Sequence, residues 1–317
     1  MSGPYHEGSL AVQRRLGVRE LADHVGRSIG PGIRPVAAAF LELQPLLVLG
    51  AADGEGRVWS SLLTGAPGFV RATGPHAVSV AGGVPDGDPL AAALTRPPGA
   101  PDTSGSAPIH LIDPVDPGVP VGTIALDPRT RRRMRLNGTA RPSARGLTIA
   151  AREVFSNCPK YLQQRELLGA ASGRGSGAVR HGERLTAAQA AFVRAADTFF
   201  IATVAPGHGA DASHRGGNPG FVRVTSPTEL SWPDYRGNAM FLTLGNLEAD
   251  GRAGLLFLDW TGGTTLQLTG TARTVFDAGG RTVRFTVEHV LEREDASPLR
   301  WSAPAYSPAN PEVIKEG

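Results

Sequence analysis

The feature that most constrains this chain is an internal repeat. The segment "PGFVR" at 67–71 recurs at 219–223, an offset of 152 residues, and "GTAR" at 138–141 recurs at 270–273, an offset of 132 residues. Two matched blocks in the same order indicate a tandem duplication, in which each copy forms one structural unit. The sequence therefore predicts two units, 1–174 with an N-terminal helical arm and 175–317, with the boundary in a Gly- and Ser-rich linker.

The two copies differ in length between the matched blocks. The offsets of 152 and 132 make the first copy 20 residues longer in this interval. The extra residues fall within 81–108, which is rich in Pro, Gly and Asp, so we predict a mobile surface loop there.

The fold class follows from short apolar runs separated by turn residues. In the second copy, Thr186 and Gln189 are spaced as the capping box of a short helix, and six strand-like runs follow it. The contents of 41 Gly and 26 Pro suit many short strands and turns. We predict a mainly β protein with flanking helices (α+β), in which each copy forms a small closed barrel.

Composition excludes several classes of function. The single cysteine, Cys158, rules out an internal disulfide framework, and we expect no metal site. No apolar run is long enough for a membrane helix and the first residues lack a signal pattern, so we expect a cytoplasmic protein without a membrane partner. A net charge of +3 and 6% aromatic residues argue against a nucleic-acid partner. The basic run at 129–135 is either an anion-binding strand face or a solvated one.

Several motifs together resemble a known family. They are "HEGSLAVQRRLG" near the start, "NCPKYLQQR" at 157–165, and "SHRGGNPGFVRV", "WPDYRGNAMFLTLGNL" and "LQLTGTAR" in the second copy. This set resembles the pyridoxamine 5'-phosphate oxidase-like family of flavin-binding split β-barrel proteins. The resemblance implies two tandem split β-barrel units, packed as an intrachain pseudo-dimer, with FMN bound noncovalently in the groove between them. The protein would then be a monomeric pseudo-dimer or a homodimer.

The resemblance also places the flavin phosphate in the second unit. It implies a strand-to-helix turn at Tyr235, Arg236, Gly237 and Asn238, which offers a cation together with hydroxyl and amide donors. Small relatives carry a lysine near the position of Asn238, so the charge falls on Arg236, Arg215 or Arg223. The first copy has only the loop around "GGVPDGDPL" here, which predicts one flavin site per chain.

Comparison of the copies separates scaffold from specialised residues. Ser213, His214 and Arg215 fall on Ser61, Leu62 and Leu63, whereas the following Gly-x-Pro-Gly is shared. We interpret the shared residues as turn chemistry. Arg215 would contact the flavin or an acidic ligand, or else be solvated. His214 is a candidate for proton transfer, although it could also be an exposed loop histidine.

The remaining candidates complete the predicted site. Lysine occurs only at positions 160 and 315 among 32 basic residues, so Lys160 is a second candidate for a catalytic role, near a flavin carbonyl or a substrate anion. Cys158 is either a reactive thiol or a buried one. The predicted cofactor-binding set comprises Ser213, Arg215, Gly216, Arg223, Tyr235, Arg236, Gly237, Asn238, Thr243, Trp59 and Arg135.

The predicted function is an FMN-dependent oxidoreductase. A small organic substrate would exchange electrons with FMN, and an electron donor or oxygen would complete the cycle. Two alternatives stay open at this point, namely a non-catalytic flavin-binding module and a split-barrel protein that uses heme or a deazaflavin.

Overall fold

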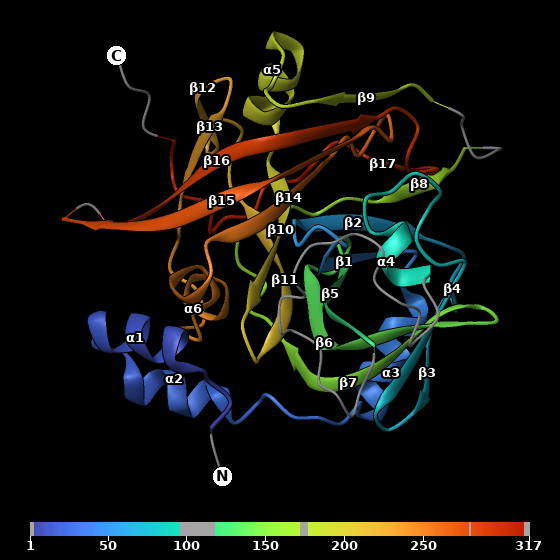
Figure 1. The fold of residues 1–317 in the computed structure, drawn as a ribbon, viewed down its shortest axis with the longest axis horizontal. Helices are drawn as coiled ribbons and strands as arrows, with labels where there is room; N and C mark the ends of the chain where they lie inside the picture. Colours follow the sequence, from blue (N-terminus) through green and yellow to red (C-terminus); the bar gives the residue numbers. More distant parts are fainter. Residues whose placement is uncertain (1–2, 96–117, 172–176, 279, 314–317) are drawn as a thin grey trace.

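The structure is a computed structural model that describes residues 3–95, 118–171, 177–278 and 280–313. The predicted boundary near residue 175 and most of the second half of the 81–108 loop lie outside the described residues. Two curved sheets with short flanking helices make up the molecule (Figure 1). The helices are α1 Glu7–Arg15, α2 Arg19–Gly26, α3 Pro35–Leu43, α4 Ala91–Thr95, α5 Ala187–Ala195 and α6 Leu242–Ala249.

The strands fall into two sets that follow the repeat. The first set is β1 Leu46–Ala52, β2 Val58–Thr64, β3 Val70–Gly74, β4 Ala77–Ala81, β5 Val119–Asp127, β6 Arg132–Ser143 and β7 Gly146–Ser156. The second set is β10 Thr198–Ala205, β11 Gly209–Gly216, β12 Arg223–Ser226, β13 Glu229–Pro233, β14 Arg252–Leu258, β15 Thr265–Asp277 and β16 Gly280–Arg293. Three short strands, β8 Leu167–Ala170, β9 Val179–Gly182 and β17 Leu299–Trp301, lie outside the repeat.

The two sheets have the same strand order. The first runs β2-β1-β5-β6-β7-β4-β3 and the second β11-β10-β14-β15-β16-β13-β12, with β9 added beside β16. Each strand of one sheet thus has its repeat partner at the same place in the other. Even the bulges coincide, at Asn137/Gly138 and at Thr269/Gly270, within the shared "GTAR" segments. The duplication and the mainly β fold class are confirmed.

Each barrel is split rather than closed. Among the described residues, the pairing runs from β2 at one edge to β3 at the other, and from β11 to β12 in the second unit, without returning to the first strand. The edge strands β2 and β11 instead face the other unit. The predicted closed barrel is therefore corrected to a split barrel, because the partner unit covers the open edge.

The apolar runs of β1 and β10 are explained by burial on both faces. Leu47 and Leu49 point into the core of the first unit, whereas Leu46 and Val48 alternate with them into a core shared by both units. In β10, Phe200 enters the same shared core. A strand buried on both faces needs apolar residues at every position rather than at alternate ones.

Close backbone contacts across the interface show that the units are related by an approximate two-fold axis. A Cβ atom on Gly122 would lie 2.3 Å from Cα of Asp211, and one on Gly254 would lie 2.6 Å from Cα of Trp59. Gly254 is the repeat partner of Gly122, and Asp211 is that of Trp59. The same contact is therefore made twice, as expected of an intrachain pseudo-dimer.

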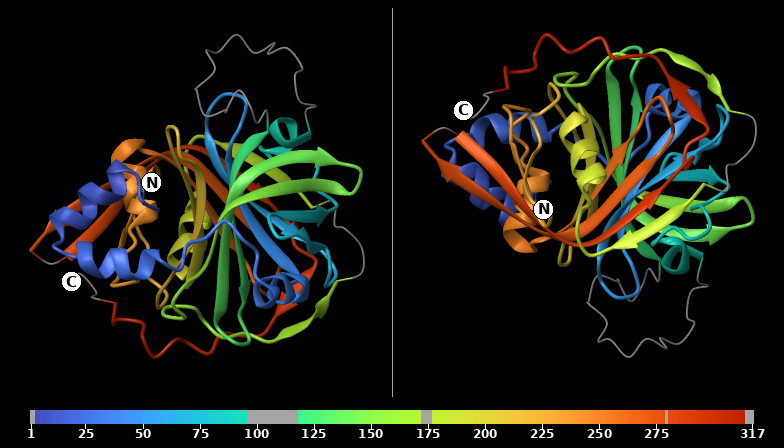
Figure 2. Two further views of the ribbon diagram at one scale, coloured as in Figure 1. Left: turned by 90° about the horizontal axis from the view of Figure 1, so that it is seen from below. Right: turned by 90° about the horizontal axis from the view of Figure 1, so that it is seen from above.

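The N-terminal arm packs on the second unit. Helix α1 lies against α6, and Nε2 of Gln13 donates a hydrogen bond of 2.9 Å to the carbonyl of Met240 (Figure 1). At the other end of the chain, β17 pairs with β8 (Figure 2). No helix in the described ranges is long and apolar enough to cross a membrane.

Candidate functional site

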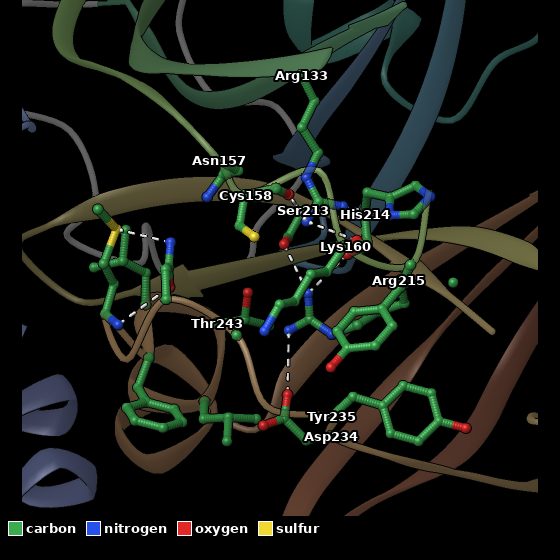
Figure 3. Close-up of a pocket in the computed structure, with 18 of the residues that line it drawn as sticks. Arg133, Asn157, Cys158, Lys160, Ser213, His214, Arg215, Asp234, Tyr235 and Thr243 are labelled. Atoms are coloured by element: carbon green, nitrogen blue, oxygen red, sulfur yellow. Dashed lines mark hydrogen bonds and ion pairs between the residues drawn. The ribbon is translucent and has the colours of Figure 1, made fainter. Parts of the chain in front are cut away.

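A cavity of about 110 Å³ lies where the two units meet (Figure 3). The first unit contributes the start of β6 and the segment 157–161, and the second unit contributes the end of β11 and the segment 233–244. Ten of the predicted site residues line this cavity: Arg135, Lys160, Ser213, His214, Arg215, Gly216, Tyr235, Gly237, Asn238 and Thr243.

Three predicted residues do not line this cavity. Trp59 is buried in the core of the first unit and donates its indole N–H to Asp53 over 2.9 Å. Its predicted role as a cofactor contact is wrong, because the two-fold axis places it on the opposite side of the interface. Arg223 and Arg236 line an adjoining cavity of about 480 Å³, which shares Asp234 and Tyr235 with the first.

The residues Ser213 to Gly216 belong to a strand and not to a loop. They end β11, which pairs with β10 so that Ser213 lies opposite Ile201 and His214 opposite Phe200. Alternation along the strand sends Ser213 and Arg215 to one face and His214 to the other. The sequence missed this strand because "GADASHRG" has none of the β-branched or large apolar residues that mark strands.

The turn that follows β11 recurs in the first unit. Gly220 and Gly68 both have φ of +91°, a conformation that favours glycine. The amide N–H of Phe221 donates to the carbonyl of Asn218 over 3.0 Å, and that of Phe69 donates to Ala66 over 2.9 Å. The shared Gly-x-Pro-Gly thus builds the same turn in both units, as the comparison of the copies predicted.

His214 is buried and pairs with an arginine of the other unit. Its Nδ1 accepts a hydrogen bond of 2.6 Å from the guanidinium of Arg133. Because arginine can only donate, the proton of the neutral imidazole lies on Nε2, which has no partner among the described residues. Burial, followed by the charges of Arg133 and Arg215, holds the pKa of His214 well below its usual value. The expectation of an exposed loop histidine is wrong.

The guanidinium of Arg133 is partly buried, and its polar partners are all neutral. Besides His214, it donates to the carbonyl of Cys158 over 2.7 Å and to that of Lys160 over 3.4 Å. Burial and the neighbouring charges of Arg215 and Arg135 lower the pKa of Arg133 to about 10. No carboxylate in the described part of the chain forms an ion pair with it, so its charge remains uncompensated at the cavity wall.

The other two arginines of the cavity are tied to carboxylates. Arg135 forms a buried ion pair with Asp211. Arg215 lies 3.8 Å from Asp234, which makes a closer contact of 2.9 Å with Arg281. Nε of Arg135 and Nε of Arg215 are both buried without a hydrogen-bond partner in the described structure. The cavity therefore has a surplus of positive charge and of hydrogen-bond donors.

A buried polar network that the sequence did not reveal lies behind Arg135. Asn137 donates to Glu153 over 2.9 Å and to Asp211 over 3.1 Å, and Thr243 lies 3.4 Å from Asp211. Burial raises the pKa of Glu153. This network holds Arg135 in place through Asp211. Its members come from both units, so no local sequence pattern brings them together.

The first unit closes the cavity with the segment 157–161. Tyr161 has φ of +65° and its hydroxyl donates to the carbonyl of Arg236 over 2.9 Å, while its ring lies 5.1 Å from that of Tyr235. Lys160 is exposed and reaches the cavity beside the half-buried Cys158 (Figure 3). The two tyrosines and Lys160 thus form the outer wall of the site.

The second unit supplies the predicted strand-to-helix turn. It connects β13 to α6, and Oδ1 of Asn238 accepts from the amide of Met240 over 3.2 Å. Ala239 and Phe241 have positive φ values of 62° and 55°, which are uncommon for residues other than glycine. Strained backbone of this kind persists where the surroundings enforce it, and it often marks functional sites.

These features fit a flavin better than a neutral ligand. The surplus of buried cations and the free Nε atoms suit a ligand that carries negative charge and several acceptor oxygens. The first cavity alone is smaller than the ~300–1,000 Å³ usual for small-molecule sites, so a flavin would extend into the adjoining one. The arginines of that second cavity then lie within the same binding region. No group of His, Cys, Asp and Glu suited to a metal occurs among the described residues.

Comparison with known proteins agrees with this picture. The family model for pyridoxamine 5'-phosphate oxidase matches residues 185–301. The match lies within the second unit. The pyridoxamine 5'-phosphate oxidase match covers β10 to β17 and therefore includes the end of β11 and the turn before α6. The first unit lies outside the match and shares the strand order. A search of curated proteins gave no match.

Several solved structures are similar to part of the chain. HupZ from Group A Streptococcus is 13% identical with a TM-score of 0.27, covering 36% of this chain and 98% of its own. A FAD-binding protein from Mesorhizobium loti is 14% identical with a TM-score of 0.27, covering 37% and 97%. A pyridoxinephosphate oxidase family protein from Clostridium acetobutylicum is 14% identical with a TM-score of 0.24, covering 34% and 87%.

Proposed function

We propose that this protein is an FMN-dependent oxidoreductase that acts on a small organic molecule. The observation that supports the proposal most directly is Arg133, a partly buried guanidinium that forms no ion pair with a carboxylate of the described residues, at a cavity between two split-barrel units. Burying such a charge is unfavourable, and a bound anion would offset that cost. A flavin, whose reduced form is anionic, is the ligand that the family match within the second unit favours.

Each residue would then have a defined task. When bound, FMN supplies the group that accepts or donates a hydride. Arg133 and Arg215 would stabilise negative charge that develops on the ring system, and Lys160 would orient an acidic group from the solvent side. Arg223 and Arg236 in the adjoining cavity would hold the phosphate. Tyr161 and Tyr235 would flank the opening, where a substrate enters.

His214 has a different task from the one that the sequence suggested. Its Nδ1 accepts from Arg133, so this nitrogen cannot take a proton from a substrate while that contact is made. From the Nδ1 contact, we propose that His214 positions the guanidinium of Arg133. The resulting assembly is one FMN per chain within two units, 1–174 and 175–317, of a cytoplasmic protein that works as a monomeric pseudo-dimer or as a homodimer.

The first test is the absorption spectrum of the purified protein, followed by titration with FMN. Bands near ~450 nm and quenching of flavin fluorescence are expected, whereas a Soret band would indicate heme instead. Arg215→Leu should weaken FMN binding at least about tenfold, since a charge-assisted contact contributes about 1.5–3 kcal/mol. The matched control is Arg273→Leu, because Arg273 is exposed on β15 away from the site.

Two outcomes would overturn the proposal. A colourless protein that binds neither FMN nor FAD would exclude a flavin site. A protein that binds FMN but shows no turnover with NAD(P)H, with oxygen as acceptor or with a panel of organic acceptors would be a flavin-binding module and not an enzyme.

A further inference from the structure

The two-fold axis implies a second position equivalent to the candidate site. By the offsets of the repeat, Ser213 corresponds to Ser61, and Arg135 corresponds to Gln267. The structure brings this second pair into contact across the interface, whereas Ser213 and Arg135 line one cavity. Nε2 of Gln267 lies 3.2 Å from Oγ of Ser61 and donates to the carbonyl of Ser60 over 3.0 Å.

A carboxylate of the chain itself fills this second position. Asp88 accepts a hydrogen bond of 2.6 Å from the hydroxyl of Ser61, and one of 3.2 Å from Nε2 of Gln267. The amide of Leu90 donates to the same carboxylate over 2.9 Å, and the charge of Arg293 lies nearby. Asp88 is thus held as a ligand would be, by a serine, an amide and a neighbouring cation.

The loop that carries Asp88 is the repeat partner of the turn at the candidate site. It connects β4 to α4, as the segment 234–241 connects β13 to α6. In the first unit the loop turns inward and closes the position. In the second unit the turn, with positive φ at Ala239 and Phe241, leaves a cavity instead.

The candidate site has donors at the same two positions, and although Arg135 pairs with Asp211, no carboxylate of the described residues contacts Ser213. Oγ of Ser213 accepts from Arg215 over 2.7 Å, so its own proton is free to donate. Nε of Arg135 is buried and has no hydrogen-bond partner in the described residues. In the other half, Asp88 accepts hydrogen bonds from the corresponding side chains of Ser61 and Gln267.

We infer that the ligand of the candidate site places an anionic oxygen between Ser213 and Arg135, where Asp88 stands in the other half. This inference deepens the proposed function, because it names the group that the site recognises. A carboxylate of the substrate and an anionic oxygen of the flavin share this chemistry. On this view Asp88 takes the place of a second external ligand, in keeping with the predicted single site per chain.

The first experiment tests the carboxylate position and needs no flavin. Asp88→Ala should lower the melting temperature, and formate or acetate at about 0.1 M should restore part of the loss, because a ligand that binds only the folded state stabilises it. The melting temperature of Asp88→Asn, which keeps an acceptor oxygen, should rise less when formate or acetate is added. Equal responses of Asp88→Ala and wild type to formate would show that the position does not bind carboxylates.

The second experiment applies the same probe to the candidate site. Acetate should raise the melting temperature of the wild-type protein, and Ser213→Ala should abolish that increase. Ser61→Ala is the matched control, since it weakens the Asp88 contact but leaves Ser213 intact. An acetate response that Ser213→Ala leaves unchanged would overturn the inference.

Titration with FMN separates the two possible sources of the oxygen. If the oxygen belongs to the flavin, Ser213→Ala should weaken FMN binding about tenfold, in line with a charge-assisted hydrogen bond. If the oxygen belongs to the substrate, Ser213→Ala should leave the affinity for FMN unchanged and should abolish only the acetate response. Failure of FMN to bind the wild-type protein would refute the proposed function, and the acetate response would still decide the inference.

Discussion

Replacing His214 with leucine should change how the stability of the protein depends on pH. The first unit has Leu62 at the equivalent position, so the strand accepts leucine there. In the folded chain the pKa of His214 is held well below 6.5 by burial and by the charges of Arg133, Arg215 and Arg165. In the unfolded chain the same imidazole titrates near ~6.5. As the pH falls below ~6.5, the imidazole is therefore protonated in the unfolded state while it stays neutral in the folded state.

The sign and size of the effect follow from this difference. Above the unfolded pKa both states are neutral and the full stability is present, and it is lost as the pH falls. Between about pH 7.5 and about pH 5 a single such histidine removes ~2 kcal/mol from the free energy of unfolding. His6 is partly buried and burial lowers its pKa too, so the wild-type protein should lose more than this amount. The contribution of His214 alone is the difference in pH dependence between the wild-type protein and His214→Leu.

Urea denaturation at the two pH values measures this difference. His214→Leu should lose ~2 kcal/mol less than the wild-type protein between them, whatever its stability at neutral pH. His181→Leu is the matched control, because His181 is exposed on β9, and it should keep the wild-type dependence. Parallel pH dependences of His214→Leu and wild type would refute the picture of a buried neutral imidazole held by Arg133.

Three further predictions concern stability and binding. Arg215→Leu should change the free energy of unfolding little in urea titration, because Asp234 keeps its 2.9 Å contact with Arg281, and a loss of several kcal/mol would contradict that view. Gly254→Ala should destabilise the protein by about 1–3 kcal/mol or more through its contact with Trp59, whereas Gly54→Ala, with no atom within 4 Å, should be neutral in the same assay. Asp197→Ala should cost about 3–5 kcal/mol, since it leaves the buried Arg165 without its partner at 2.6 Å, while calorimetric FMN binding at low temperature stays the same.

The strand order could be predicted from the repeat, but one strand could not. Recurrence of "PGFVR" and "GTAR" at fixed offsets required two units with the same strand order, and the structure has them. Strand β11 was missed because its residues are small or charged. Its place in the sheet is set by the hairpin with β10 and by the contact of Asp211 with Gly122, and the second of these depends on a residue far away in the sequence.

The site residues were predictable where a motif or the comparison of the copies marked them. Arg215 stood out because its partner in the first copy is a leucine. The environment of His214 was not predictable, since its hydrogen-bond partner Arg133 lies 81 residues away in the other unit. Trp59 was assigned to the site because of its aromatic ring, and only the two-fold axis shows that it occupies the opposite half.

The two halves of the interface differ mainly in buried charge. Arg133, Arg135, His214 and Arg215 on one side correspond to Thr265, Gln267, Leu62 and Leu63 on the other. A homodimer would have to bury the arginine cluster twice, at a cost that only bound ligands could offset. Duplication within one chain removes that requirement, because each copy can change by itself. One half is packed core closed by Asp88, and the other holds Arg133, which forms no ion pair in the described structure, beside the paired Arg135 and Arg215.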